Sequence, residues 1–530
     1  FLDDLHWADQ SSLDFLRYLV RRPAGGSLRV LVTWRTEEVP PGHTLRGWVE
    51  ELRRAGKGTL VSLPRMGRED VAVLVRGAGL SEELADGLYE ETEGLPFFVV
   101  EWLEAIGQGA DPERGFVGGR LLRSRLETVS ELSRQVLTAA AVVGRSFAFE
   151  TISSAGGRSE EETVDALEEL TLRGLIRELP MKGASPSYDF SHERLRRLVY
   201  EDASLARRRL LHRRVGDALA TRAIRDHRLP ASQVALHYRS AGEDERAAQW
   251  HRRAGDQARA VYANREAIEH FEAALALGHE DRAPLHEAVA DLRTLVGEYG
   301  KAQANYELAA ALGGPHDLAA VEHKLGNLCG RRGLWELAEG HFEVALEALE
   351  EVEALGRRAR LLADWSHAVH RLGRTEKAIA LAEEAWRLAE DAGDLQALAQ
   401  AHNILGVLAK GRGELMEAGR HLERSLGLAE FLGDAPAQVA ALNNLSLVRG
   451  AAGASEEGID LLQRALAVGK AQEDRHREAA LHNNLADLFR AAGRQDEAMT
   501  HLKEAVGLFA EIGADEETPM QPEIWKLVEW

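Results

Sequence analysis

The chain has 530 residues, 45% hydrophobic and 28% charged, which is typical of a folded globular protein rather than a disordered one. Its 86 acidic residues outnumber its 65 basic ones, and residues 231–530 hold 50 of the acidic and 32 of the basic residues. An acidic region repels phosphate backbones, which argues against nucleic acid as a partner there. The single cysteine, Cys329, excludes an internal disulfide framework and fits a reducing cytoplasm. No apolar run approaches the ~18–20 residues of a membrane-spanning helix, so we expect a cytoplasmic protein without membrane contact.

Residues 1–60 alternate short apolar runs with amphipathic stretches, the pattern of an α/β unit. Phe1–Asp4 reads as the end of a buried strand, 11–22 as a helix and 28–34 as a second, β-branched strand. Because no initiator Met and no earlier strand precede Phe1, we expect the chain to be the C-terminal part of a longer protein.

The next two segments differ in their periodicity. Residues 61–118 are helical with a break at 94–96, which predicts a small helical domain. Residues 119–230 predict two helices, over 132–143 and 160–172, followed by extended pieces at 175–179 and 188–190. Helix, helix and hairpin is the order of a winged-helix domain.

Residues 231–515 contain a helical repeat. A glycine recurs at the turn between two helices, at spacings of 36, 40, 40, 40 and 40: Gly297, Gly333, Gly373, Gly413, Gly453 and Gly493. Small residues stand seven before, five after and twelve after each glycine, where two helices need to approach closely. This pattern resembles the tetratricopeptide repeat in a 40-residue form and predicts an α-solenoid. The fold class is therefore mainly α, with a partial α/β domain.

Two carboxylates, Asp3 and Asp4, follow the first strand end. The carboxyl edge of a parallel sheet is where ligands bind in open α/β folds, and paired carboxylates there can hold a Mg²⁺-bound water and orient an attacking water. The alternative is a pair of solvated turn residues.

The order of motifs resembles the signal-transduction ATPases with numerous domains (STAND), which include the maltose-operon activator, large LuxR-type regulators and cyclase-associated ATPase modules. The resemblance implies ATP/ADP and Mg²⁺ as cofactors, Asp3 as the Mg²⁺ ligand through water, and Asp4 and Arg35 as catalytic residues near the γ-phosphate. It also implies that Pro96, in Gly94-Leu95-Pro96, packs on the adenine. His192, in Tyr188-Asp189-Phe190-Ser191-His192, matches a histidine that touches the β-phosphate.

The phosphate loop of that family, Gly-x-x-x-x-Gly-Lys-Ser/Thr, is not found in residues 1–530. Gly56-Lys57-Gly58-Thr59 imitates it, but Glu51 replaces the first glycine and the segment follows a helix instead of preceding one. We expect the loop upstream of Phe1 and no ATP hydrolysis by this chain alone.

The resemblance divides the chain into five parts. These are the second half of a nucleotide-binding domain (1–60), a helical lid (61–118), a winged-helix domain with connecting helices (119–230), the repeat array (231–515) and a tail (516–530). The tail begins its apolar run after Pro522 and predicts either a cap on the last repeat or a docking peptide.

The expected function is a signalling ATPase in which ATP–ADP exchange switches a closed monomer to an open state that can oligomerise. The repeats would bind a protein, a peptide or a small inducer. One alternative is a non-catalytic repeat scaffold with a degenerate ATPase remnant. Another is a DNA-binding regulator, since arginines cluster at 207–214, although leucines interrupt them as an apolar stripe of a solvated helix.

Asparagines occupy the same position in three successive repeats, at Asn403, Asn443 and Asn483. The position lies two residues before the packed leucines and turns roughly 200° away from the helix–helix seam, toward the concave groove. An amide offers a donor and an acceptor, which suits a peptide backbone, so we expect partner binding here. The alternative is that these amides only bridge neighbouring helices.

Overall fold

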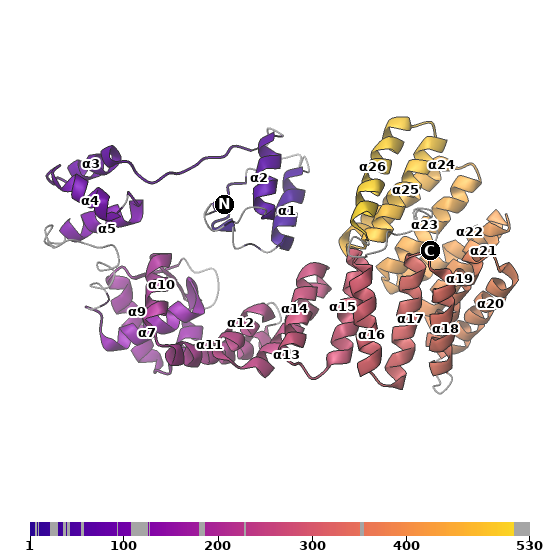
Figure 1. The fold of residues 1–530 in the computed structure, drawn as a ribbon, viewed down its shortest axis with the longest axis horizontal. Helices are drawn as coiled ribbons and strands as arrows, with labels where there is room; N and C mark the ends of the chain where they lie inside the picture. Colours follow the sequence, from indigo (N-terminus) through magenta and orange to yellow (C-terminus); the bar gives the residue numbers. More distant parts are fainter. Residues whose placement is uncertain are drawn as a thin grey trace. The chain divides into compact units, whose positions relative to one another are not determined.

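The computed structural model describes residues 1–5, 8, 10–21, 30–34, 39, 43–54, 58–92, 94–107, 126, 128–179, 186–226, 229–349 and 355–512. The described chain is mainly α-helical with one small sheet, as the sequence predicts (Figure 1). It divides into two compact units: residues 1–229 with 236–243, and residues 230–235 with 244–530.

The first unit contains helices and all three named strands. They are α1 (Gln10–Arg21), α2 (Thr44–Arg54), α3 (Arg68–Gly77), α4 (Leu84–Thr92), α5 (Pro96–Gly107), α7 (Glu131–Val143), β1 (Ser146–Ala148), α8 (Phe149–Gly156), α9 (Glu160–Leu172), β2 (Ile176–Glu178), β3 (Ser187–Phe190), α10 (Glu193–Asp202) and α11 (Leu205–Arg225). Helix α12 (Ala231–Ala241) follows.

The N-terminal segment packs α1 and α2 around Leu13, Leu16, Leu45 and Trp48. The helix predicted over 11–22 is confirmed by α1. The two predicted strands meet in a parallel bridge between Leu2 and Val32, while residues 22–29 lie outside the described chain. A parallel bridge is the pairing that the α/β interpretation requires.

The region from 66 to 107 is helical, and its predicted break is confirmed. Gly94 adopts a φ of +66°, and its carbonyl accepts a hydrogen bond from the backbone N–H of Met66 at 2.8 Å. A Cβ at Gly94 would lie 2.1 Å from the Met66 carbonyl oxygen, so only glycine fits this close approach. Pro96 then begins α5, because proline is favoured in the first helical turn.

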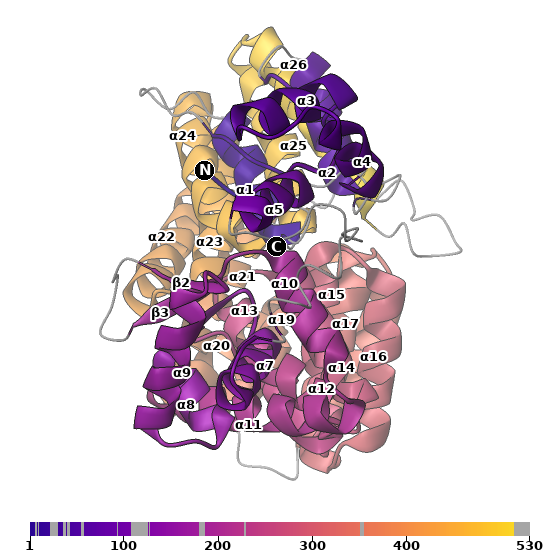
Figure 2. The ribbon, with the colours of Figure 1, turned by 90° about the vertical axis from the view of Figure 1, so that its left-hand side faces the viewer.

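Residues 128–204, which we call the helix–sheet segment, place α7, α8 and α9 beside an antiparallel sheet of order β1-β3-β2 (Figure 2). Its core includes Leu137, Ile152, Leu170 and Phe190. The predicted helices and the β2–β3 hairpin are present, and the sequence reading missed β1 and α8. Helix α9 begins with a capping box between Ser159 and Glu162.

The second unit is a run of antiparallel helix pairs. They are α13 (Asp244–Ala260), α14 (Asn264–Ala276), α15 (Arg282–Val296), α16 (Tyr299–Leu312), α17 (Pro315–Arg331), α18 (Trp335–Leu349), α19 (Leu355–Arg371), α20 (Thr375–Ala392), α21 (Leu395–Gly411), α22 (Leu415–Leu432), α23 (Ala435–Ala451), α24 (Ser455–Gly469), the short 3₁₀ helix η3 (Lys470–Gln472), α25 (Arg475–Ala491) and α26 (Gln495–Glu511).

Small residues in the repeat lie where the two helices of a pair touch, as predicted. A Cβ added at Gly326 would lie 2.4 Å from the ring of Phe342, and one at Gly406 would lie 2.6 Å from Leu422. Real Cβ atoms do not approach so closely, so these positions let the helix axes come together.

The repeat array also closes on itself. Tyr299 of α16 and His476 of α25 share a hydrogen bond of 2.7 Å, and the Asn264 amide donates to the Gln472 carbonyl at 3.0 Å. Apolar residues of α26, including Phe509, pack in the same cluster as Tyr299. An end repeat of an open solenoid needs a cap, whereas here earlier helices of the array cover the last pair. The tail proposed as a cap, residues 516–530, lies outside the described chain.

Candidate functional site

One hydroxyl, that of Thr33, bonds the carboxylate of Asp3 and the backbone N–H of Asp4 at the first strand end. Thr33 Oγ1 donates to Asp3 at 2.5 Å and accepts from the backbone N–H of Asp4 at 3.0 Å. Asp4 has a φ of +55°, a conformation that costs energy for a residue other than glycine. The side chain of Asp4 is 14% exposed and that of Asp3 is 49% exposed. Both predicted carboxylates therefore lie together beside the parallel bridge.

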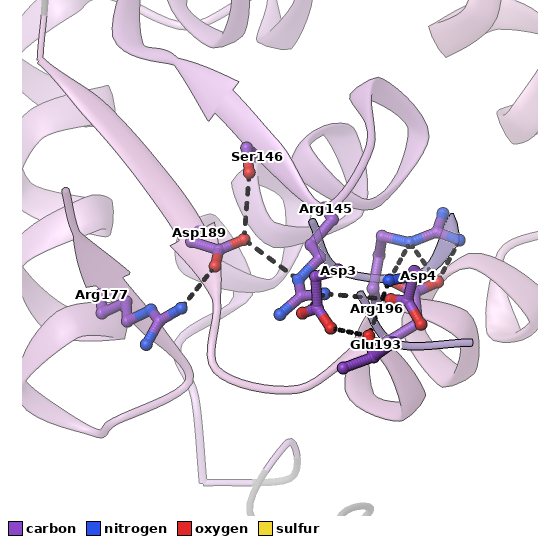
Figure 3. Close-up of polar contacts among 9 residues, drawn as sticks. Asp3, Asp4, Arg145, Ser146, Arg177, Asp189, Glu193 and Arg196 are labelled. Carbon is purple, nitrogen blue, oxygen red and sulfur yellow. Dashed lines mark hydrogen bonds and ion pairs between the residues drawn. The ribbon is translucent and has the colours of Figure 1, made fainter. Parts of the chain in front are cut away.

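A basic residue of the helix–sheet segment faces these carboxylates. Arg145, directly before β1, places a guanidinium nitrogen 3.4 Å from Asp4 Oδ2 and 3.8 Å from Asp3 Oδ2 (Figure 3). The guanidinium also lies 3.7 Å from the buried carboxylate of Asp189. Arg145 thus connects the strand-end carboxylates to the small sheet, a contact between residues 141 positions apart.

Asp189 is the anchor of this network within the sheet. Its carboxylate accepts from Arg177 at 2.8 Å and from Ser146 at 3.2 Å, across the strand pairs that β3 makes with β2 and β1 (Figure 3). Nearby, Glu193 and Arg196 form a close ion pair in the first turn of α10. The motif 188–193 therefore supplies structural ion pairs as well as the predicted His192.

The other residues predicted for the nucleotide site are Pro96, His192 and Arg35. Pro96 is exposed at the start of α5, and His192 is exposed as the N-cap of α10. Arg35 lies outside the described residues. The nucleotide roles of all these residues stay predictions.

The arginine cluster at 207–214 lies on α11. Arg213 lies 3.8 Å from Glu243, and the guanidinium of Arg208 stacks over the ring of Tyr200. Leu211 on the same helix is fully buried. Arg213 is exposed, so the cluster is consistent with the solvated helix face that the leucine stripe predicts, and the DNA-binding alternative stays a prediction.

The repeat array contains a cavity of about 420 Å³. Its walls come from the first helices of five successive pairs, α17, α19, α21, α23 and α25, with Trp335 and Phe342 of α18 and Ser425 of α22. The polar and aromatic lining residues are Asn327, Arg331, Trp335, Phe342, Asp364, His367, Gln396, Gln400, Asn403, Ser425, Asp434, His476 and Arg477. The volume lies in the range of sites for small ligands, ~300–1,000 Å³.

One wall of the cavity is organised by Asp364. Its carboxylate accepts hydrogen bonds from His323 at 2.7 Å, from Asn327 at 3.0 Å and from Gln400. Burial alone would raise the pKa of Asp364, but these hydrogen bonds hold that pKa below its usual value. Asp364 therefore stays ionised and fixes two amides of the wall.

Another part of the lining carries two arginines around one carboxylate, Asp474. Arg331 binds Asp474 with two parallel hydrogen bonds, at 2.7 and 2.9 Å. Arg477 Nε lies 3.5 Å from the same carboxylate, and its side chain donates to the carbonyl of Pro436 at 3.2 Å. Burial would raise the pKa of Asp474, but the charge of Arg331 holds it well below its usual range. Burial, with Arg331 nearby, lowers the pKa of His476 to about 3.

Two of the three asparagines predicted to bind a partner, Asn403 and Asn443, join Asn444 and Asn484 in a hydrogen-bonded ladder across three helices. Asn444 donates to Asn403 at 3.0 Å, Asn443 donates to Asn444 at 3.1 Å, and Asn484 donates to Asn443 at 2.8 Å. Asn443 is fully buried, and Asn483 is only partly buried. The bridging alternative describes the contacts of Asn403 and Asn443, while partner binding stays a prediction. Asn403 also lines the cavity.

A tetratricopeptide repeat family model matches residues 439–511. Residues 439–511 are tetratricopeptide repeats. This match covers α23 to α26, and the same helix pairing continues through the preceding pairs. No curated protein matches the chain.

Solved structures similar to the chain include a STAND protein with a tetratricopeptide repeat sensor from Pyrococcus horikoshii. It is 15% identical, has a TM-score of 0.47, and the match covers 85% of this chain and 67% of that one. A Rap protein complexed with competence and sporulation factor is 15% identical with a TM-score of 0.39, over 51% of this chain and 78% of that one.

Among the described residues, no cluster of histidine, cysteine and acidic side chains has the arrangement of a metal site. Within the same described residues, no helix is long and apolar enough to cross a membrane.

Proposed function

We propose that the chain is the switch and sensor part of a STAND-type signalling ATPase. The tetratricopeptide repeats would recognise an inducer or partner, and the first unit would report whether ATP or ADP is bound. The observation that carries this proposal is the pair Asp3 and Asp4 at a parallel strand end, faced by Arg145 from the helix–sheet segment.

The donor set suits the cofactor that the resemblance implies. Carboxylate oxygens are the ligands that Mg²⁺ prefers, and Asp3 would hold Mg²⁺ through water while Asp4 orients the attacking water. Mg²⁺ bound with ATP would supply positive charge at the phosphates.

Arg145 belongs to the helix–sheet segment and contacts both carboxylates, so it links the nucleotide site to that segment. Arg145 and Mg²⁺ are both cations that can bind these carboxylates. Binding of Mg²⁺ therefore weakens the contact between Arg145 and the carboxylates, and the Arg145 contact weakens binding of Mg²⁺. Occupation of the nucleotide site would then loosen the Arg145 contact, and loss of nucleotide would restore it. Two ligands that compete for one group are thermodynamically coupled in both directions.

The test uses the chain extended upstream to include the expected phosphate loop. We expect Mg²⁺-dependent binding of a fluorescent ATP analogue, and we expect Asp4→Asn to slow turnover more than it weakens binding. Arg145→Gln should tighten Mg²⁺-nucleotide binding, whereas Arg158→Gln, on the same segment but bonded to Gln135, should not. Failure of the extended protein to bind nucleotide would refute the switch.

The rival function is a repeat scaffold with a nucleotide domain that no longer binds nucleotide. The matched repeats at 439–511 fit this function equally well, because they require no nucleotide. The same binding experiment decides between the two.

A further inference from the structure

Four pairs of histidines face each other across consecutive helices of the described chain. In every pair the two Nδ1 atoms lie at hydrogen-bond distance, 2.9 Å in three pairs and 3.1 Å in one, and the ring planes are tilted by 39–43°. The pairs are His212–His237, His251–His270, His402–His421 and His482–His501. The same geometry at four places indicates one recurring arrangement.

Three of these pairs occupy one position of the repeat. The first histidine stands eleven residues before the turn residue and the second stands eight residues after it. The turn residues are Tyr262, Gly413 and Gly493, all with a positive φ. Two other repeats keep a different hydrogen bond at this position. These are His286 with Asn305 at 3.0 Å, and His341 with Glu322 at 2.7 Å.

Two further repeats place leucines at the same position. The leucine pairs are Leu362–Leu381, on α19 and α20, and Leu442–Leu461, on α23 and α24, and each pair lies in one apolar cluster. The position therefore needs packing between two helices and requires no polar group. Histidine adds a property that leucine lacks, because its charge changes between pH 5 and 8.

Protonation of such a pair has two steps with different consequences. In the neutral pair one Nδ1 carries the hydrogen and donates it to the other. A first added proton can go to Nε2 of the donating ring, and the hydrogen bond then stays. A second proton must go to the accepting Nδ1, which removes the hydrogen bond and brings two positive rings together. A leucine pair has no corresponding step.

Burial opposes protonation of the pair on α21 and α22. Burial, with positive charge from His421 and Arg424, lowers the pKa of His402 to about 4. Burial also lowers the pKa of His421, although one nearby carboxylate acts in the opposite direction. The charged groups that act on His421 are Glu417, Arg420 and Arg412.

The pair on α25 and α26 behaves in the same way. Burial, with positive charge from His501 and Lys470, lowers the pKa of His482 to about 4. Burial lowers the pKa of His501 too, against the opposing charges of Glu504 and Glu497 and with the help of Lys470. An unfolded histidine takes up its proton near pH 6.5. The packed pair is therefore fully stable above that pH and loses stability as the pH falls below it.

The helices α25 and α26 are also those through which the array closes. Tyr299 shares a hydrogen bond with His476 of α25, and Phe509 of α26 packs in the same cluster as Tyr299. Separation of α25 from α26 would therefore release both contacts.

We propose that the His402–His421 and His482–His501 pairs are an acid-sensitive switch, which loosens α21–α22 and α25–α26 and opens the closed array as the pH falls below about 6.5. The leucine pairs stay packed under the same conditions. The inference goes beyond the proposed function and requires no nucleotide.

The experiment measures hydrogen exchange of the 530-residue chain by mass spectrometry at pH 7.5 and 5.5, with labelling times scaled to the intrinsic exchange rate at each pH. Below pH 6.5 we expect the opening constants of α21–α22 and α25–α26 to rise by about tenfold per pH unit for each histidine that the open form protonates. The pairs α19–α20 and α23–α24 are internal controls, because they carry leucines, and their opening constants should rise less than about tenfold in total.

Variants assign the effect to the histidine pairs. His482→Leu with His501→Leu copies the leucine pair of α23 and α24, and it should reduce the acid-induced rise in α25–α26 by about tenfold or more. His476 of α25 also takes up a proton on opening, so the readout is the difference between variant and wild type. His402→Leu with His421→Leu is the reciprocal control and should reduce the rise in α21–α22 alone.

A milder variant covers the case in which the double leucine protein fails to fold. His501→Asn copies the pair of His286 with Asn305, whose amide oxygen accepts from the ring and takes up no proton. It should also reduce the rise in α25–α26. An equal rise in the leucine and histidine helix pairs of the wild type would overturn the inference. An unchanged rise in α25–α26 of the folded variants would overturn it as well.

Discussion

Asp474 stabilises the closed repeat array in two ways, as the ion-pair partner of Arg331 and as the N-cap of α25. Replacing it with different residues separates these two contributions to the unfolding free energy. The carboxylate binds Arg331 through two hydrogen bonds, and it also caps α25 by accepting from the backbone N–H of Arg477 at 3.1 Å. The side chain is 4% exposed, and that of Arg331 is 20% exposed. The ion pair is therefore buried, and loss of Asp474 leaves the positive charge of Arg331 without its carboxylate partner.

Removal of one partner from a buried ion pair costs roughly 3–5 kcal/mol of unfolding free energy. Loss of an N-cap costs about 1 kcal/mol. We therefore expect Asp474→Ala to lose both contributions and Asp474→Asn to lose chiefly the ion pair, because asparagine also caps helices well.

The array provides its own control at the equivalent position of another repeat. Asp394 caps α21 by accepting from the N–H of Ala397 at 2.9 Å, and its nearest basic group, on Arg360, is 3.8 Å away. Asp394→Ala should cost about 1 kcal/mol, the value of a cap with a weak surface pair. The Arg331→Leu and Asp474→Leu double variant should recover part of the loss, because both members of the Arg331–Asp474 pair are then removed together, while the cap of α25 and the contact with Arg477 are still lost.

Unfolding in urea, followed by circular dichroism, measures these free energies, and hydrogen exchange of α25 shows where the array opens. Equal costs for Asp474→Ala and Asp394→Ala would refute the reasoning, since the two residues would then act only as caps. Fast exchange confined to α25 and α26 in the Asp474→Asn protein is the expected local signature.

Three further predictions concern the repeats. Gly326→Ala should destabilise the array by about 1–3 kcal/mol through overpacking, whereas Gly340→Ala, whose Cβ would meet nothing within 4 Å, should be neutral or stabilising in thermal melts. The pKa of His476 is lowered to about 3, so the unfolded chain takes up this proton first as the pH falls, and His476 alone should contribute a loss of about 1.4 kcal/mol of stability per pH unit below 6.5. Urea midpoints at pH 7.5 and 5.5 should show a smaller drop for His476→Gln, and an unchanged drop would contradict this. Asn443→Ala should cost about 1–3 kcal/mol because buried amides lose partners, and Asn483→Ala should cost less; equal melting temperatures would make the ladder unimportant for stability.

The repeat could be read from the sequence because its determinants are local. Close approach of two helices within a pair requires small residues at fixed distances from the turn, and Gly326 and Gly406 supply them opposite Phe342 and Leu422. Closure of the array could not be read in this way. It depends on the rotation accumulated over many pairs, which brings Arg331 to a residue 143 positions away.

The strand-end carboxylates were predictable for a similar reason, and their partner was not. Asp3 and Asp4 follow an apolar run directly, whereas Arg145 belongs to another segment and reaches them only through packing of that segment. The sequence also contains a regular pattern of helix caps that the sequence analysis did not identify. Asp394, Asp434 and Asp474 recur at intervals of 40 residues, and all three cap the first helix of a pair.

The asparagine ladder shows why the two sequence alternatives for these residues are not exclusive. Asn403 accepts a hydrogen bond from Asn444 and also stands in the cavity wall, so the ladder fixes the orientation of a side chain that a ligand would meet. Asn443 lies further along the same ladder and receives the amide of Asn484. Substitution of the asparagines would therefore change stability and binding together, and their loss cannot assign a binding role. The ladder therefore couples the packing of α21 against α23 to the shape of the cavity wall.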